Sequence, residues 1–229
     1  MSALFIPYDT YERHKKVGEL LGEGKTVVDI GGQLNMLSRF SKHSKLIVAN
    51  LDSSQEKSDV KIDKGKLPFE NNSFDISCAI DVLEHVPQPK RRDFIKELLR
   101  ISGEKTILSF PIGTNRHKEY ELEIQSWLER KKQDVSYLKE HIKFGLPTEK
   151  EVRELTKGMN VKLFYSGNLL INKILFKLFL FDPNIPILRR IIYFLKSTIY
   201  FLTNPILYAM LARKKYSDSI VRAYLVIEK

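Results

Sequence analysis

Short apolar strands alternate with helical segments in the first half of the chain, and this alternation restricts the fold more than any other feature of the sequence. Runs rich in valine, isoleucine and leucine occupy residues 26–30, 46–50, 74–80 and 106–110, with a weaker run at 59–62. Helical spacing of apolar residues predicts a helix over 90–101, and a surface helix is expected over 11–21. Apolar strands that alternate with helices predict a parallel sheet covered on both faces.

An acidic residue lies at or just after the end of four of these strands. In chain order they are Asp29, Asp52, Asp63 and Asp81. Because ligands of such sheets bind beyond the carboxyl ends of the strands, we expect the four carboxylates to ring one crevice. Carboxylates accept hydrogen bonds from hydroxyl and amine groups and repel phosphates, which favours a nucleoside without phosphates. The alternative is that each aspartate only caps the following turn or helix.

Residues 26–112 resemble the class I methyltransferases that use S-adenosylmethionine. The motifs that carry the resemblance are VDIGG at 28–32, NLDS at 50–53, DKGKLPF at 63–69, and FDI at 74–76 followed by DVLEHV at 81–86. The resemblance implies an α/β, Rossmann-like doubly wound sheet of seven strands, whose antiparallel seventh strand is expected at 221–228 beside a sixth at 161–166. It also implies a methyltransferase whose cofactor is S-adenosylmethionine. The residues expected to contact this cofactor are Asp29, Gly31, Gly32, Asp52, Asp63, Asp81 and His85.

The first motif departs from the family pattern of three glycines at alternating positions. Only Gly31 is kept, and Gln33 and Asn35 occupy the other two positions. Asn35 suits its position, because asparagine tolerates a left-handed backbone. Gln33 brings a side chain where bare backbone is expected. Either the loop is displaced, or Gln33 itself binds the methionine end of the cofactor, or the chain is a non-catalytic methyltransferase-like binding module with a decayed cofactor site.

Two histidines are the candidate catalytic residues. The resemblance is closest to a subgroup that accompanies surface-polysaccharide and glycoconjugate synthesis, which has a segment like HIKFGLP at 141–147. This implies a small or lipid-linked saccharide acceptor that is methylated on a sugar hydroxyl. A hydroxyl acceptor needs a general base, and histidine serves near neutral pH. His117 follows the fifth strand and His141 lies in a lid-like insertion over 113–147.

Residues 169–219 form an apolar, basic insertion, whereas residues 1–168 and 220–229 are expected to form the methyltransferase domain. Helices are expected over 169–181 and 187–203, with a break at Asn204 and Pro205. A narrow cationic stripe on a broad apolar helix is typical of a helix that lies in a membrane interface. The uncharged run at 197–212 is shorter than the roughly 20 residues that span a bilayer. Alternatively, the insertion packs on its own domain or on a second copy in a homo-oligomer.

The charge of the chain is concentrated in this last part. The net charge is +10, and residues 169–229 hold ten basic and three acidic side chains. The remainder is nearly balanced in charge, which argues against a nucleic-acid partner. An RNA methyltransferase is therefore the weaker alternative. The expected partner is instead an anionic membrane surface contacted through 169–213, or a phosphate-bearing lipid carrier.

The cysteine content bears on metal binding and on the compartment. Cys78 is the one cysteine, so a multi-cysteine zinc site is excluded, and no metal site is predicted. With no signal peptide at its start, the chain is expected in the cytoplasm, at the inner face of the membrane.

Overall fold

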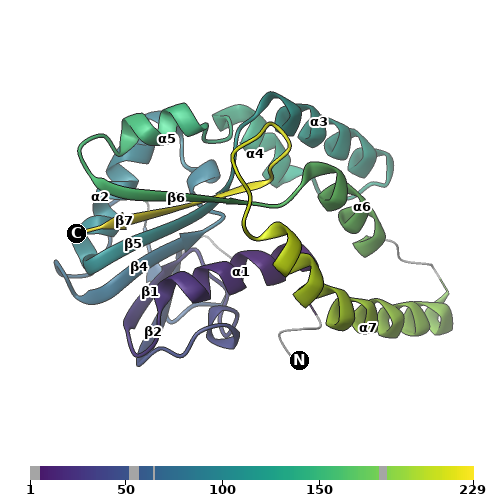
Figure 1. The fold of residues 1–229 in the computed structure, drawn as a ribbon, viewed down its shortest axis with the longest axis horizontal. Coiled ribbons are helices and arrows are strands. Elements are labelled where there is room, and N and C mark those ends of the chain that lie inside the picture. Colours follow the sequence, from purple (N-terminus) through teal and green to yellow (C-terminus); the bar gives the residue numbers. More distant parts are fainter. Residues whose placement is uncertain (1–5, 52–56, 64, 181–184) are drawn as a thin grey trace.

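A seven-stranded sheet with helices on both faces forms the centre of the molecule (Figure 1). This computed structural model describes residues 6–51, 57–63, 65–180 and 185–229. The strand order is β3-β2-β1-β4-β5-β7-β6. All neighbouring strands are parallel except β7, which runs antiparallel between β5 and β6. The predicted doubly wound sheet with an antiparallel last strand is confirmed.

The strands follow the apolar runs of the sequence closely. They are β1 (Thr26–Ile30), β2 (Lys45–Leu51), β3 (Val60–Ile62), β4 (Phe74–Ile80), β5 (Ser102–Pro111), β6 (Asn160–Ser166) and β7 (Arg222–Glu228). Only β5 differs by more than one residue at an end from its predicted run, because it begins at Ser102 instead of residue 106. Ser102 pairs with Phe74 of β4, and this pairing extends β5 beyond its apolar run.

The helices cover the two faces of the sheet and the edge formed by the carboxyl ends of its parallel strands. They are α1 (Tyr8–Leu21), α2 (Arg91–Ile101), α3 (Asn115–Arg130), α4 (Ser136–Phe144), α5 (Glu149–Leu155), α6 (Leu169–Phe179) and α7 (Pro186–Leu211), with 3-10 turns η2 (Leu37–Arg39), η3 (Leu83–His85) and η4 (Gln88–Lys90). One core joins the sheet to α2 and α5, and a second joins its other face to α1. Helix α1 contains the helix predicted over 11–21, and the side of it that includes Val17 and Leu21 is buried against the sheet.

Helices α6 and α7 lie between β6 and β7 in the chain. The break predicted at Asn204 and Pro205 is wrong, because α7 continues through Pro205 to Leu211. A proline inside a helix removes one backbone donor, which costs stability unless packing compensates for it. Here the flanking turns are held against α1, because the Asn204 amide donates to Ile6 O at 2.9 Å and the Tyr8 hydroxyl donates to Leu207 O at 3.2 Å. The opposite end of α7 extends away from the sheet (Figure 1).

Candidate active site

A cavity of about 370 Å³ lies where the carboxyl ends of β4 and β5 meet the start of β7. Volumes of this order are typical of small-molecule sites. The walls come from α1, η3, α3, α4, α6 and α7 as well as from the sheet. Arg222 belongs to this edge because β7 is antiparallel, so its first residue pairs with Pro111 at the end of β5. The elements that the sequence places far apart therefore meet at one cavity.

The loop after β1 brings backbone close to the buried Asp29 carboxyl group. A Cβ atom on Gly32 would lie 1.9 Å from Asp29 Oδ2, so only glycine fits there. Gly31 has a φ of 80° and its N–H donates to Ala49 O at 2.8 Å. The Asn50 amide donates to Gly32 O at 2.7 Å and holds the loop on β2. The two glycines therefore make room for the protein's own side chains, because a Cβ atom on Gly31 would lie 2.5 Å from Val82 Cγ2.

The other residues predicted for the cofactor spread along the same edge of the sheet. Asn35 has a φ of 63°, so it takes the left-handed conformation that the missing glycine would supply. Gln33 and Asp63 are exposed. Asp52 lies outside the described residues. Of the described residues predicted for the cofactor, Asp81 and His85 line the cavity, whereas Asp29, Gly31, Gly32, Gln33, Asn35 and Asp63 do not.

Burial raises the pKa of Asp29 to about 7. The side chain is 1% exposed, and the Cys78 thiol is its hydrogen-bond donor at 3.6 Å. A weak thiol donor does little to stabilise a buried carboxylate. The carboxyl group of Asp29 therefore takes up its proton near neutral pH and gains its charge more readily when a cation lies nearby.

Asp81 is neutralised by two arginines from opposite ends of the chain. The Arg13 guanidinium lies 2.8 Å from one Asp81 oxygen, and the buried Arg222 guanidinium donates to the other. Although burial opposes the charged form, these arginines lower the pKa of Asp81 to about 2. Asp9 also contacts Arg222, at 3.4 Å. This charged network ties α1 and β7 to the carboxyl end of β4 and forms one polar wall of the cavity.

His85, His117 and His141 all line this cavity, although they come from three different elements. His117 is 2% exposed, and its Nδ1–H donates to Ile112 O at 2.8 Å, which leaves the Nε2 lone pair as the basic site. Burial lowers the pKa of His117 and the pKa of His85, which favours neutral imidazole rings. A neutral imidazole in the wall of a cavity can accept a proton from a hydroxyl group.

Two arginines important for this site were not predicted from the sequence. Arg222 gives only one local signal, a charge at the start of a strand whose next five residues are largely apolar. Arg91 is fully buried, and its guanidinium donates to Val86 O at 3.1 Å, to Glu151 at 2.8 Å and to Gly145 O. Because Val86 follows η3 and Gly145 follows α4, Arg91 holds together the two segments that carry His85 and His141.

Comparisons with known proteins bear on the family and on the fold. The family model of a methyltransferase domain matches residues 18–109. Among curated proteins, none matches the chain. A SAM-dependent methyltransferase from Thermotoga maritima aligns with a TM-score of 0.55 at 15% identity, covering 99% of this chain and 91% of that one. The magnesium protoporphyrin IX methyltransferase of Synechocystis with bound SAH aligns with a TM-score of 0.46 at 12% identity, covering 96% and 86%. The first alignment supports the fold of nearly the whole chain.

Proposed function

Because the chain carries a class I S-adenosylmethionine-dependent methyltransferase domain, we propose that it methylates a sugar hydroxyl of a small or lipid-linked acceptor. The cofactor supplies a methyl group on a positively charged sulfur, which is an activated leaving group. The protein therefore needs to align the acceptor and to remove its proton. The observation that carries the proposal is the cavity at the carboxyl ends of β4 and β5, with a buried neutral histidine in its wall.

The two sides of the cavity differ in polarity. His117 and Glu121 line it from α3, whereas Leu175, Phe176 and Phe179 line it from α6. A ligand that fits both sides carries hydroxyl groups at one end and apolar groups at the other. A lipid-linked saccharide has this composition, whereas RNA needs a basic groove with stacking aromatic residues. This contrast favours the saccharide acceptor over the RNA alternative.

In this proposal His117 is the general base. Its Nδ1–H bond to Ile112 O fixes the orientation of the ring, so that Nε2 can accept the proton of the acceptor hydroxyl. His141 lines the same cavity from α4, but its Nδ1 is bound by Glu121 at 2.7 Å. We therefore expect His141 to act on the acceptor together with its neighbours Glu84 and His85 and not as the general base.

Replacing His117 with alanine is expected to lower methyl transfer at least tenfold and to leave cofactor affinity unchanged. General bases contribute factors of about 10²–10⁴, and Gly31 and Gly32 of the β1 loop are not among the residues that line the cavity with His117. The readouts are transfer of a radiolabelled methyl group to saccharide and lipid fractions, and calorimetric titration with S-adenosylmethionine. His43→Ala is the matched control, since His43 lies outside the cavity lining. Unchanged turnover of the His117→Ala variant would remove His117 from the mechanism. If the wild-type chain does not bind cofactor at millimolar concentration, the result would favour a non-catalytic module.

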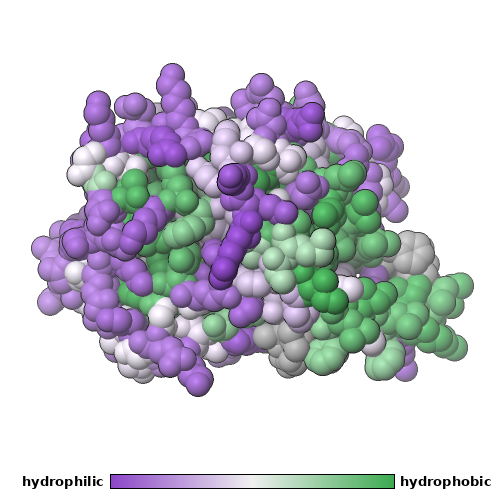
Figure 2. All heavy atoms as spheres, in the orientation of Figure 1, coloured by the Kyte–Doolittle hydropathy of each residue, from purple (hydrophilic) through white to green (hydrophobic). Residues whose placement is uncertain are grey.

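The insertion is proposed to hold the enzyme on an anionic membrane surface. None of the described helices has the length and apolar character to cross a membrane. Instead, α6 turns its cations inward, because Lys173 and Lys177 pair with Glu123 of α3. Its apolar side therefore faces outward together with that of α7, where Ile187 is 75% exposed and Phe194 is 70% exposed. Figure 2 shows this apolar surface on the part of the molecule that α6 and α7 occupy.

In this proposal apolar insertion contributes more to membrane binding than the cations of α6 do, because Lys173 and Lys177 are already paired with Glu123. An exposed apolar face of this extent marks an interaction surface. Helices of this kind bury one face in the lipid interface, where tyrosine rings such as those of Tyr193 are favoured. A lipid-linked acceptor presented at the same surface would then reach a cavity that α6 and α7 themselves line.

The double variant Ile187→Ser/Phe194→Ser is expected to lose binding to anionic vesicles by at least tenfold in a flotation assay. Burying either side chain in an apolar medium is worth about 1.5–3 kcal/mol, so the pair exceeds the 1.4 kcal/mol of a tenfold change. The matched control is Leu122→Ser/Ile142→Ser, which removes two exposed apolar side chains from α3 and α4. A wild-type chain that does not float but sediments as a dimer would show instead that a second copy covers this surface.

A further inference from the structure

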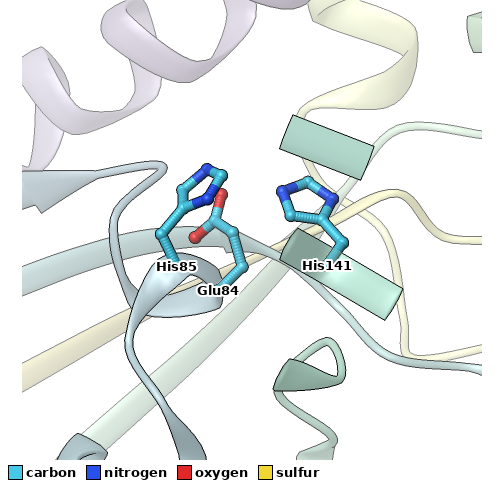
Figure 3. Close-up of side chains that lie close together, drawn as sticks. All are labelled: Glu84, His85 and His141. Atoms are coloured by element: carbon cyan, nitrogen blue, oxygen red, sulfur yellow. The ribbon is translucent and has the colours of Figure 1, made fainter. Parts of the chain in front are cut away.

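Glu84, His85 and His141 converge at the edge of the cavity. One nitrogen or oxygen atom from each lies within 4.8 Å of the corresponding atoms of the other two. The rings of His85 and His141 are 4.9 Å apart between centroids. Figure 3 shows the Glu84 carboxyl group and the His85 ring together, with the His141 ring facing them. Two of the three ligands are consecutive in η3, and the third is brought to them by α4.

Each histidine of this cluster is oriented by a carboxylate behind it. His85 Nδ1 lies 2.7 Å from Glu140 Oε2, and His141 Nδ1 lies 2.7 Å from Glu121 Oε1. When Nδ1–H donates to a carboxylate, the lone pair of the ring is on Nε2. Metal-binding histidines usually have this arrangement, in which the carboxylate fixes the tautomer and makes the ligating nitrogen more basic.

Two atoms of the cluster are buried without a hydrogen-bond partner among the described residues. They are Glu84 Oε2 and His141 Nε2. Glu84 is 1% exposed and His141 is 7% exposed, so solvent does not satisfy these atoms. Buried polar atoms in native proteins nearly always have a partner, and an unpaired oxygen beside an unpaired imidazole nitrogen points to a ligand that both can bind. Both atoms can offer a lone pair, and with His85 they supply the three ligand atoms that a metal cation needs.

We propose that Glu84, His85 and His141 bind a divalent transition-metal ion, with zinc and manganese as the ions that this ligand set suits. Imidazole favours zinc and its neighbours, carboxylate also suits manganese, and three protein ligands with open positions are the arrangement of catalytic sites. Ligands about 2.1 Å from a tetrahedral zinc lie about 3.4 Å from one another, so the widest separation here needs to close by at most about 1.4 Å.

All three proposed ligands line the cavity, so a substrate in the cavity would reach an ion that they hold, which gives the ion a role in the proposed reaction. This step rests on the proposed function. An acceptor hydroxyl oxygen that binds the ion becomes more acidic and passes its proton to His117 Nε2. The oxygen then forms a bond to the methyl carbon, while the carbon–sulfur bond breaks and its electron pair stays on sulfur. The products are the methyl ether, the neutral thioether form of the cofactor and one proton, which leaves from His117.

Metal binding can be tested without cofactor or acceptor. Chain freed of any histidine tag and stripped with a chelator is titrated calorimetrically with Zn²⁺ and with Mn²⁺. We expect one ion per chain for wild type and His43→Ala, and affinity at least tenfold lower for Glu84→Gln and for His141→Ala. Glu121→Gln should weaken binding about 10–100-fold, because it acts only through the orientation of His141. Circular dichroism checks that each variant is folded.

Two results would overturn the site: a wild-type chain that binds neither ion stoichiometrically, or binding that is equally tight in the Glu84 and His141 variants. X-ray absorption of the zinc-loaded chain adds an independent readout, since two imidazole ligands are expected. The reaction is tested separately by measuring radiolabelled methyl transfer before and after chelation. Metal binding without any methyl transfer would therefore contradict the proposed function and leave the metal site standing, whereas transfer unaffected by chelation would contradict only the catalytic role of the ion.

Discussion

Replacing Arg222 with methionine is expected to lower the free energy of unfolding by about 3 kcal/mol. Breaking a buried ion pair by removing one partner costs about 3–5 kcal/mol, because the other charge stays behind without compensation. Arg222 is 4% exposed and contacts both Asp81 and Asp9. The lower end of the range applies, since Arg13 remains 2.8 Å from Asp81 and compensates part of its charge. Urea denaturation monitored by circular dichroism measures the change.

The matched control is Arg153→Met, which removes an arginine that pairs with Glu149 at 2.6 Å on the surface of α5. The Arg153 side chain is 60% exposed, so its loss should change stability by less than about 0.5 kcal/mol. Adding Asp81→Asn to Arg222→Met should recover part of the loss, because the uncompensated carboxylate is then removed. If Arg222→Met is as stable as the control variant, the network is not a structural support of the site.

Most of the fold could be predicted from the sequence because its strands are buried on both sides. A strand such as β4 (Phe74–Ile80) is an apolar run bounded by polar residues, so its limits are visible without tertiary information. The continuous helix α7 could not be predicted in this way. The local penalty of Pro205 predicts a break, and the contacts of α7 with α1 that outweigh it join residues about 200 positions apart.

In the candidate site, too, some residues could be predicted from local sequence and others only from long-range contacts. His117 and His141 could be singled out because each lies in a segment after a strand at the ligand-binding edge, and both line the cavity. Their partners follow from long-range geometry. Glu121 and His141 meet only because α3 packs against α4, and Glu84 joins them only because Arg91 links η3 to the turn after α4. The prediction of no metal site rests on the cysteine count, and a cluster of one glutamate and two histidines from distant segments cannot be found in that way.

Replacing Asp29 with asparagine is expected to stabilise the free protein at pH 8 by up to about 4 kcal/mol and to have little effect near pH 4. The pKa of Asp29 rises from 3.8 to about 7 on folding, mainly through burial. Between these values the folded state binds more protons than the unfolded state, so the free energy of unfolding falls as the pH rises. A shift of this size corresponds to about 4 kcal/mol, and asparagine avoids it because it stays neutral. Unfolding free energies measured from pH 4 to 8 test the prediction.

Asp75→Asn is the control, for which the expected change in the free energy of unfolding at pH 8 has the opposite sign. Asp75 accepts hydrogen bonds from the Thr26 backbone N–H at 2.7 Å and hydroxyl at 2.8 Å, and these bonds lower its pKa. Its contribution to stability is therefore present above the unfolded pKa and lost as the pH falls, so Asp75→Asn should destabilise the protein at pH 8. If Asp29→Asn also destabilised it there, the Asp29 carboxylate would have to be stabilised by contacts other than its thiol donor.

The free-energy cost of ionising Asp29 in the free protein is expected to affect ligand binding at the β1 loop. A cationic ligand beside the loop would favour the ionised carboxyl group, so that binding compensates the charge that folding leaves buried. S-adenosylmethionine carries a positive sulfur and S-adenosylhomocysteine does not. Asp29→Asn should therefore weaken the first more than the second in calorimetric titrations at pH 8. Equal losses for both would show that Asp29 acts by shaping the loop around Gly32 and not through its charge.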